Sequence, residues 1–565
     1  MKSTSGKAVL AVAAVSSLLI AFGDNNYFVV PPGTLGVPAD PDYLSWETAG
    51  TNIHEAVYLS NAVPAQDGTR KNEQNRLYVK TGTYVVTNEL VLGDCRYEIR
   101  SSKGPGAQDE LDREGTVLRG GYPATTNRIF KMSAGSASRC SQIRGLTIAN
   151  GWVGADTKDG RSAGHYGGGV CISSSAHPHS GVYDCNVVSN TAFCGCGGGV
   201  AVMTVGGVVS NCLVACNTAT NVWAKGYNGY EFGGGGISLN LLGVSSTASS
   251  TRTSGGRIFD CIVSNNLVTG NSAEGSGIRA ARAGYWFENC LLVDNRAEPL
   301  PGGDMKYPGA IRCDRLACVV GCIVTNNNEE GISCGPCSLV SNCVVVCSGG
   351  VSVGDDELDN VTRPSIVVGC YLNGGGSGSS IAYATAKNSI LRNCHVTGYG
   401  NTREGAVVAA HTQTRIENCT IVRNYRGLRT RNNIYPAVVN CVFDNRYSKY
   451  AQDISMPADA TQGGAALSNC WFYAQDRIQG FTPNVDCVFT NNAGFVDMAG
   501  ADYHLVKKSI LRDAGLKMDW MVGATDIEGN PRMIGYWGKS SAEALPDIGC
   551  YECTIGFKGM LLMVR

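Results

Sequence analysis

The sequence contains few charged residues, and their signs nearly cancel. Charged side chains make up 16% of the chain and the formal net charge is −1, so the overall balance favours neither nucleic acid nor an acidic membrane as a partner. After the N-terminal region no apolar run is long enough to cross a bilayer, which takes about 20 residues. Long helices are also disfavoured, because there are 73 glycines and each costs a helix roughly 1 kcal/mol relative to alanine. We therefore expect no nucleic-acid partner, no transmembrane segment in the mature chain, and a fold rich in tight turns.

The first 23 residues have the pattern of a secretory signal peptide. Lys2 and Lys7 begin it, residues 8–20 form a short apolar run, and the small residues Ala21 and Gly23 precede Asp24. The run is short for a membrane span. We expect cleavage before Asp24 and a secreted or cell-surface protein, with an uncleaved anchor as the alternative.

Cysteine is abundant, but its spacing does not resemble a compact disulfide framework. The chain has 25 cysteines, an odd number, so at least one thiol has no partner within the chain. Twelve of them recur, most at intervals between 21 and 32 residues, a repeat length typical of solenoids. The long interval from Cys212 to Cys261 contains a Ser-, Thr- and Gly-rich stretch that indicates an inserted loop. The twelve are Cys185, Cys212, Cys261, Cys290, Cys322, Cys343, Cys370, Cys394, Cys419, Cys441, Cys470 and Cys487. The second residue after each is always apolar, which gives the two-residue period of a strand with one buried face.

Asparagine is frequent five positions after the repeat cysteine. Because asparagine tolerates left-handed backbone, we place it at a sharp corner after the strand. Stacked amides can also hydrogen-bond along a column. The asparagines at this position are Asn190, Asn217, Asn266, Asn295, Asn327, Asn424 and Asn492.

A glycine-rich strand alternates with the cysteine strand, as at Gly167, Gly197 and Gly233. Two or three short strands per repeat make a coil, and stacked coils pair their backbone groups with one another. The pattern predicts an all-β fold, a single-stranded right-handed parallel β-helix of about 13 coils. A helical spacing of apolar residues within residues 51–63 predicts a short amphipathic helix that caps the first coil.

These segments give an expected domain order. Residues 1–23 are the signal peptide, 24–75 an N-terminal cap that contains the helix, 76–495 the β-helix, and 496–565 a C-terminal coil or cap with a short tail.

The chain resembles the pectin-lyase-like superfamily of right-handed parallel β-helix proteins. The segments 77–84 and 144–151 are similar to the early coils of that superfamily, and the motif from Asp502 to Glu552 is similar to one in secreted bacterial β-helix proteins. The alternation of glycine strands with asparagine-ended strands is similar to the passenger repeats of polymorphic outer-membrane proteins. The resemblance implies the fold and leaves function open, because one fold supports many functions.

Enzymes of that superfamily act on acidic polysaccharides, so the resemblance implies carboxylates or basic residues on an outer sheet face. The outward positions of the cysteine strands are mainly aliphatic, and Asp444 is the only carboxylate among them. Neither a general acid–base pair nor a calcium cage is evident there. Asp355 and Asp356 are similar to an element of polygalacturonase-type hydrolases, but its companion motifs are missing and a solvated loop is the better interpretation. We predict no catalytic residues, no metal site and no cofactor.

Arginines are the candidate ligand-binding residues. Arg279 and Arg312 occupy equivalent outward positions on successive glycine strands, and residues 387–449 hold ten Lys or Arg against three Asp or Glu. Arginine binds carboxylate or sulfate in a bidentate fashion, which predicts a face that binds acidic glycans. The alternative to this binding face is that the arginines are paired with carboxylates from other loops. The further candidates from the basic segment are Arg415, Arg423, Arg426 and Arg429.

We therefore predict an exported, non-enzymatic surface or adhesin-like protein that binds acidic polysaccharide or a cell-surface glycan. One alternative is a polysaccharide-active enzyme, a lyase, hydrolase or epimerase, with a site of unfamiliar form. Another is a structural component of the cell envelope, because an outward aliphatic strip would call for a partner or for self-association.

Overall fold

The structure is a computed structural model that describes residues 25–62, 74–93, 96–133, 140–154, 165–174, 176–221, 233–240, 255–270, 274–299, 309–327, 330–346, 349–353, 363–375, 383–385, 389–399, 405–409, 411, 413–430, 434–446, 452–455, 466–479, 483–533 and 543–554. The expected signal peptide, the Asp355–Asp356 pair and residues 555–565 lie outside the described residues. Within these ranges no helix has both the length and the apolar character needed to cross a bilayer.

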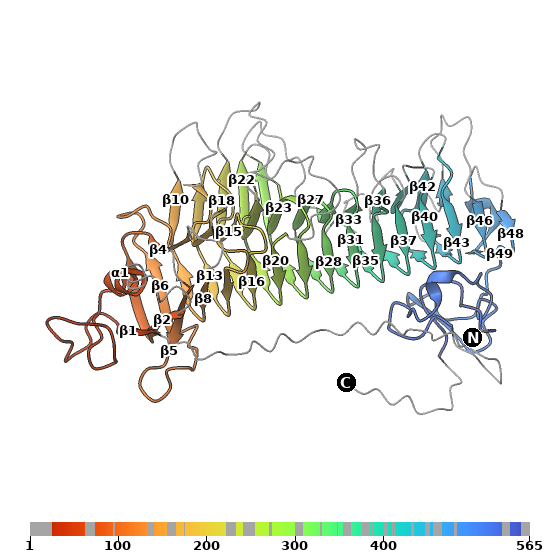
Figure 1. Ribbon diagram of the computed structural model, residues 1–565. Helices are drawn as coiled ribbons and strands as arrows, with labels where there is room; N and C mark the ends of the chain where they lie inside the picture. The colour runs from red at the N-terminus through yellow and green to blue at the C-terminus, as the bar shows by residue number, and fades with distance from the viewer. Residues whose placement is uncertain are drawn as a thin grey trace, which may run out of the picture.

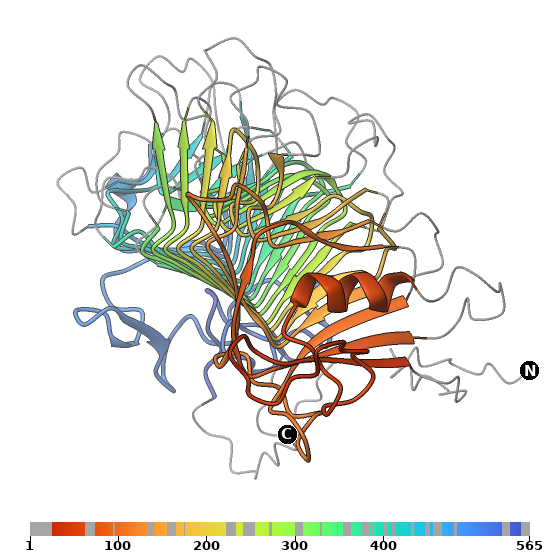
Figure 2. The same cartoon turned by 90° about the vertical axis from the view of Figure 1, so that its left-hand side faces the viewer.

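The described chain winds into an elongated stack of coils whose strands form long parallel sheets (Figure 1). The prediction of a parallel β-helix is confirmed. Three sheets run along the stack with 16, 15 and 13 strands, called here sheets A, B and C, and a five-stranded sheet D adds a fourth side to some coils. Figure 2 shows the coils lying in register one behind another.

Sheet A consists of β1 (Asn25–Val29), β2 (Gln74–Lys80), β5 (Arg96–Ser102), β8 (Ser141–Arg144), β12 (Gly181–Tyr183), β16 (Val208–Ser210), β20 (Arg257–Phe259), β24 (Trp286–Glu288), β28 (Cys318–Val320), β31 (Leu339–Ser341), β34 (Ile366–Val368), β37 (Ile390–Arg392), β40 (Arg415–Glu417), β43 (Ala437–Val439), β46 (Ala466–Ser468) and β48 (Pro483–Val485). Sheet B consists of β3 (Gly82–Val86), β6 (Thr116–Gly120), β9 (Thr147–Ala149), β13 (Asn186–Val188), β17 (Leu213–Ala215), β21 (Ile262–Ser264), β25 (Leu291–Val293), β29 (Ile323–Thr325), β32 (Val344–Val346), β35 (Tyr371–Asn373), β38 (His395–Thr397), β41 (Thr420–Val422), β44 (Val442–Asp444), β47 (Trp471–Phe472) and β49 (Val488–Phe489).

Sheet C consists of β4 (Leu90–Leu92), β7 (Phe130–Met132), β11 (Val170–Ile172), β15 (Val200–Val202), β19 (Ile237–Asn240), β23 (Ile278–Ala283), β27 (Ile311–Arg315), β30 (Glu330–Cys334), β33 (Gly349–Val353), β36 (Tyr383–Thr385), β39 (Val407–Ala409), β42 (Arg426–Thr430) and β45 (Gln452–Ser455). Sheet D consists of β10 (Trp152–Gly154), β14 (Thr191–Phe193), β18 (Thr218–Asn221), β22 (Leu267–Gly270) and β26 (Arg296–Pro299).

The helix α1 (Ile53–Ala62) lies across the first coil, next to β1 and β2 (Figure 2). Ile53, Ala56 and Val57 are buried and belong to the same apolar core as the first strands. The interior of the first coil is apolar, so the helix covers a surface that an open end would otherwise expose to water. The predicted helical cap is therefore confirmed.

The repeat cysteines line the interior of sheet B. Eleven of the twelve are buried and Cys487, in the last coil, is partly exposed. The second residue after the cysteine points inward as well, so Val263 and Leu292 are fully buried above one another. The two-residue period read from the sequence therefore identifies the core correctly.

The corners of the coil differ from the prediction by one residue. The left-handed residues are the one before the cysteine, such as Asn289 with φ 52°, and the fourth after it, such as Asp294 with φ 57°. The asparagine five positions after the cysteine was expected at this corner, and that placement is wrong. Its side chain turns inward instead, because the left-handed residue before it has already redirected the backbone.

The predicted asparagine ladder is present. Each amide nitrogen donates to the amide oxygen one coil further on, at 3.0 Å from Asn190 to Asn217, 3.0 Å from Asn217 to Asn266, 2.9 Å from Asn266 to Asn295 and 3.0 Å from Asn295 to Asn327. The side chains are buried, and a second run joins Asn424 to Asn445 at 3.1 Å. Asn492, in the last coil, is exposed and lies outside the ladder.

Residues 491–533 and 543–554, called here the C-terminal cover, lie beside the last coils rather than on top of them (Figure 1). The cover contains an antiparallel pair, β50 (Phe495–Asp497) with β51 (Asp502–Leu505). Its apolar residues Leu511 and Ile548 pack with the outward side chains Val442 and Trp471 of sheet B.

Asparagines at the corner between sheets A and B hold the backbone of the cover. Their amide nitrogens donate to carbonyl oxygens of the cover, at 3.2 Å from Asn418 to Asp547, 2.8 Å from Asn440 to Leu516 and 3.1 Å from Asn469 to Ala514. The left-handed corner thus turns these side chains outward, where they act as docking points.

His395 is buried beneath the cover, with its Nδ1 2.9 Å from the hydroxyl of Tyr551. Burial, together with a smaller effect of the nearby His504, lowers the pKa of His395 to about 4. Desolvation has this effect because it disfavours the charged imidazolium.

We predict that replacing Asn266 with alanine destabilises the protein by about 3 kcal/mol, because the buried groups of Asn217 lose their acceptor and Asn295 loses a donor. Chemical denaturation measures the change. The matched variant Thr269→Ala, at a partly exposed position of the same coil, should change stability by less than about 0.5 kcal/mol. Equal effects of the two variants would contradict the role of the ladder.

A second prediction concerns pH. The pKa of His395 is lower in the folded state than in the unfolded state, so the stability it contributes is present above about pH 6.5 and is lost as the pH falls toward about 4. The loss reaches about 3 kcal/mol. Denaturation midpoints at neutral and acid pH should therefore differ less in His395→Gln than in the wild type. An unchanged difference in His395→Gln, or the same reduction in the exposed control His179→Gln, would refute this assignment.

Candidate ligand-binding site

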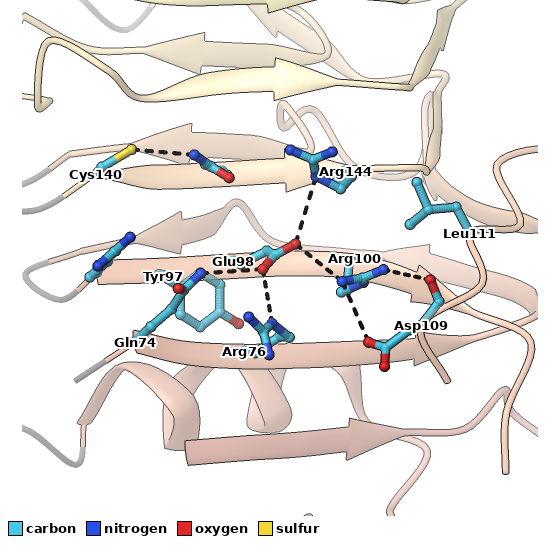
Figure 3. Close-up of a pocket in the computed structure, with 11 residues that line it drawn as sticks. Gln74, Arg76, Tyr97, Glu98, Arg100, Asp109, Leu111, Cys140 and Arg144 are labelled. Atoms are coloured by element: carbon cyan, nitrogen blue, oxygen red, sulfur yellow. Dashed lines mark hydrogen bonds and ion pairs between the residues drawn. The ribbon is translucent and has the colours of Figure 1, made fainter. Parts of the chain in front are cut away.

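A pocket of about 370 Å³ opens on the outer face of sheet A, across β2, β5 and β8 (Figure 3). Its lining is mostly polar and contains more arginines than any other residue type. The lining residues are Gln74, Arg76, Arg96, Tyr97, Glu98, Arg100, Asp109, Leu111, Cys140, Gln142 and Arg144.

Side chains alternate between the two faces of a strand, and this alternation in β2, β5 and β8 places the lining residues of these strands on one face of sheet A. Leu77, Ile99 and Ile143 are paired in register and fully buried, so the residues on either side of each point outward. The same register sets Arg76 beside Glu98. Arg100 and Arg144 are likewise paired on adjacent coils.

Glu98 lies at the centre of the pocket and joins three arginines (Figure 3). Its carboxylate oxygens are 2.9 Å from Nε of Arg76, 3.6 Å from Nη1 of Arg100 and 3.7 Å from Nε of Arg144. Gln74 donates a further hydrogen bond to Glu98 at 3.2 Å. One carboxylate therefore balances part of the repulsion among cations that stack at the spacing of adjacent strands, about 4.8 Å.

Positive charge remains in excess in the pocket. Four arginines line it against two carboxylates, Glu98 and Asp109, and Asp184 pairs with Arg144 at 3.0 Å from one side. The side chain of Arg144 is 33% exposed and that of Glu98 is 8% exposed. The cations are thus more accessible than the carboxylate that holds them together.

Neighbouring groups fix the guanidinium groups in position. Arg100 donates from Nη2 to the carbonyl oxygen of Asp109 at 2.7 Å and lies over the ring of Tyr78 at 5.7 Å. Arg144 lies over the ring of Tyr183 at 5.1 Å. Burial disfavours the charged form of Arg76, but its hydrogen bond and ion pair with Glu98 outweigh this and raise its pKa. Burial also raises the pKa of Tyr78.

This arrangement suits recognition of an anion. Guanidinium groups held in a row can each offer two parallel N–H donors to a carboxylate or a sulfate, and the spacing of adjacent coils repeats along one direction. Within the described part of the chain, no group of three or more His, Cys, Asp or Glu residues could hold a metal ion.

The arginines selected from the sequence lie elsewhere. Arg279 and Arg312 are paired on β23 and β27 of sheet C, as the sequence indicated. Arg279 is 1% exposed and forms ion pairs with Glu274 at 2.8 Å and Asp314 at 2.7 Å. Arg312 donates to the hydroxyl of Ser333 at 2.8 Å. Burial and two carboxylate partners leave Arg279 little room to contact a ligand.

The other four arginines occupy different faces. Arg415, on sheet A, pairs with the buried Glu417, which also binds Arg392 at 2.7 Å. Arg423 follows β41 and donates to the carbonyl oxygens of Met498 and Ala499 in the cover. Arg426 and Arg429 lie on β42 of sheet C and are partly exposed. The structure does not bring these residues together, and their role in binding stays a prediction.

The sequence did not predict the pocket arginines, because the cysteine and glycine repeats that indicate the strand faces begin only after these coils. The early coils have no repeat cysteine, so their inward positions are not marked by it. The alternation of Arg96, Glu98 and Arg100 in a single strand, with Tyr97 and Ile99 between them, is the signal that could have identified them.

Comparisons with known proteins find only low similarity. No family model matches the chain, and no curated protein matches it. Among solved structures, a PL6 alginate lyase in complex with a trisaccharide is 13% identical, with a TM-score of 0.42, over 82% of this chain and 89% of that chain. Pectate lyase Pel9A is 10% identical, with a TM-score of 0.26, over 94% and 96%. The catalytic domain of a GH87 alpha-1,3-glucanase in complex with nigerose is 15% identical, with a TM-score of 0.31, over 83% and 70%.

With identities and TM-scores this low, the assignment to the parallel β-helix class rests on the strand order and register of the chain itself. No substrate or catalytic residue carries over from these structures, because one fold supports many functions.

We predict that Glu98→Gln destabilises the protein by about 2 kcal/mol, because the arginines around it then lack a central counter-charge. Denaturation in a chloride buffer measures this change. Adding citrate, a polycarboxylate, should stabilise the variant more than the wild type by occupying the vacated charge position. A variant as stable as the wild type, with the same response to citrate, would show that Glu98 does not hold the cluster together.

Proposed function

We propose that this protein is exported and binds acidic polysaccharide at the pocket around Glu98, as a binding or display protein of the cell surface. The observation that carries the proposal is the row of arginines on the outer face of sheet A, in excess over the carboxylates that anchor them. A polysaccharide presents carboxylate or sulfate groups at regular intervals, and stacked coils present cations at regular intervals.

The structure of the pocket supports binding by a chain rather than by an isolated ion. The site is an open face across three successive coils, with exposed Arg96 at its edge and partly exposed Arg144 on its third strand. The rings of Tyr78 and Tyr183 flank the row. An extended ligand that follows the stack would therefore meet at least one guanidinium on each of the three coils.

Export would bring the protein to the place where it meets a cell-surface polysaccharide. The proposed signal peptide at residues 1–23 would deliver the mature chain to the outside of the cell or its surface. The proposal concerns binding, and turnover of the polysaccharide is the competing function that the experiment must separate from it.

We predict that Arg76→Ala/Arg144→Ala weakens binding of the mature protein to alginate, polygalacturonate or heparin by at least about tenfold, since each lost charge-assisted contact is worth about 1.5–3 kcal/mol. Affinity electrophoresis or calorimetry gives the change. Binding should also weaken with added salt, because exposed charges are screened. The control Arg257→Ala removes an exposed arginine from the same sheet outside the pocket and should leave the affinity unchanged.

Four results would count against the proposal. Equal affinity of the double variant and the wild type would exclude the pocket as the binding site. Equal retention of the protein on a neutral glucan would exclude recognition of the acidic groups. New unsaturated or reducing sugar ends, released by the wild type, would establish an enzyme. A loss of affinity in Arg415→Ala/Arg429→Ala but not in the pocket variant would transfer the site to the arginines first selected from the sequence.

A further inference from the structure

A loop of the early coils lies beside the arginine pocket of sheet A. The loop, called here the strap, consists of residues 103–114 and connects β5 to β6. Two strap residues, Asp109 and Leu111, line the pocket. The strap is therefore part of the surface that a ligand in the pocket would meet, and it brings a carboxylate of its own to a lining rich in arginine.

Both ends of the strap are fixed to the coil. At its beginning the backbone N–H of Gly104 donates to the hydroxyl of Ser102 at 3.1 Å. Near its end the carboxylate of Asp112 accepts a hydrogen bond from the hydroxyl of Thr81 at 2.6 Å and another from the N–H of Gly115 at 3.0 Å. These anchors fix where the tip of the strap lies, next to the pocket.

Asp109, at the tip of the strap, contacts the pocket through its side chain and its backbone (Figure 3). Its carboxylate oxygen Oδ1 accepts a hydrogen bond from the hydroxyl of Tyr78 at 3.3 Å and lies 3.7 Å from Nη1 of Arg100. Its carbonyl oxygen accepts a hydrogen bond from Nη2 of Arg100 at 2.7 Å. The carboxylate of Asp109 thus lies where a hydroxyl and a guanidinium together would hold the carboxylate of a ligand.

The carboxylate of Asp109 is held weakly. The side chain of Asp109 is 72% exposed, whereas that of Arg100 is 14% exposed. Ion pairs with an exposed partner contribute little, because water and salt screen them. A carboxylate of the ligand has the same chemistry, so it can replace the carboxylate of Asp109 without leaving the donors of Arg100 and Tyr78 unsatisfied.

The position of Asp109 lies on the path of an extended ligand. Tyr78, Arg100 and Arg144 are paired in register and form one outward column on three successive coils. Arg144, whose side chain is 33% exposed, is the more accessible of the two cations. A chain that binds Arg144 and follows the column reaches Arg100 after one strand spacing of about 4.8 Å, and there it meets the carboxylate of Asp109.

We propose that Arg100 and Tyr78 form a subsite for a carboxylate of the polysaccharide, and that Asp109 occupies this subsite until the ligand displaces it. The inference rests on the proposed function, because it concerns the same pocket and the same ligand. It narrows the ligand class to a chain of hexuronate residues, whose carboxylates match the group that Asp109 supplies. Asp109 then sets the affinity, since every ligand has to compete with it.

Calorimetric titration of the mature protein with polygalacturonate tests the proposal. Asp109→Asn removes the competing charge and keeps the size of the side chain, so this variant should bind about two- to fivefold more tightly, the range that one exposed ion pair implies. Tyr78→Phe removes one of the two donors of the subsite and should weaken binding about two- to tenfold. Thermal denaturation of both variants reports whether the fold is retained.

The matched control is Glu110→Gln, which removes the same charge from the next residue of the strap. The carboxylate of Glu110 binds Lys103 at 2.9 Å, and neither residue lines the pocket, so the control should keep the affinity of the wild type. Equal affinity of Asp109→Asn and the wild type would overturn the subsite. An equal gain in Glu110→Gln would also overturn it, because the effect would then be one of overall charge.

These outcomes are distinct from failure of the proposed function. If only the subsite is wrong, the wild type still binds polygalacturonate and Arg76→Ala/Arg144→Ala still binds it more weakly. If neither the wild type nor Asp109→Asn binds any acidic polysaccharide, the proposed function is overturned, and the subsite with it.

Discussion

The structure depends on the in-register stacking of parallel coils. Each strand pairs with its equivalent in the next coil, so every residue lies above a residue of the same position in the repeat. Inside, this places cysteine on cysteine and asparagine on asparagine, and the amides of Asn217 and Asn266 satisfy one another where water is excluded. A slip of one residue would turn the whole inward set to the surface, so the ladder and the apolar core enforce the same register.

The same constraint decides what the outer surface can do. Outward side chains also stack, so like charges on successive coils repel unless a counter-charge lies between them. Carboxylates provide such a counter-charge at three places in the structure. Glu98 lies among Arg76, Arg100 and Arg144, Glu417 lies between two arginines near the other end of sheet A, and Glu274 and Asp314 hold Arg279 in sheet C. Of these clusters, the first lines the pocket described above.

Stacking also leaves one apolar surface that the coil cannot bury by itself. The outward column of sheet B faces away from the core, so it needs a second layer. The C-terminal cover supplies that layer over the last coils through Leu511 and Ile548, and corner asparagines hold its backbone in place. The proposed glycan site lies on sheet A and the cover packs on sheet B, so binding and covering can be separated by mutation.

The sequence by itself determined the fold class, the inward face of sheet B, the asparagine ladder and the helix that closes the first coil. These features follow from local periodicity, which each repeat carries within a few residues. The left-handed corner was misplaced by one residue, because Asp, Asn and Ser all tolerate that backbone and no single type marks it. The pocket, the cover and the burial of Arg279 were decided only by the tertiary structure. Arg76, Glu98 and Arg144 become neighbours through the pairing of β2, β5 and β8. The connecting loops differ in length, so no fixed spacing along the chain predicts that pairing.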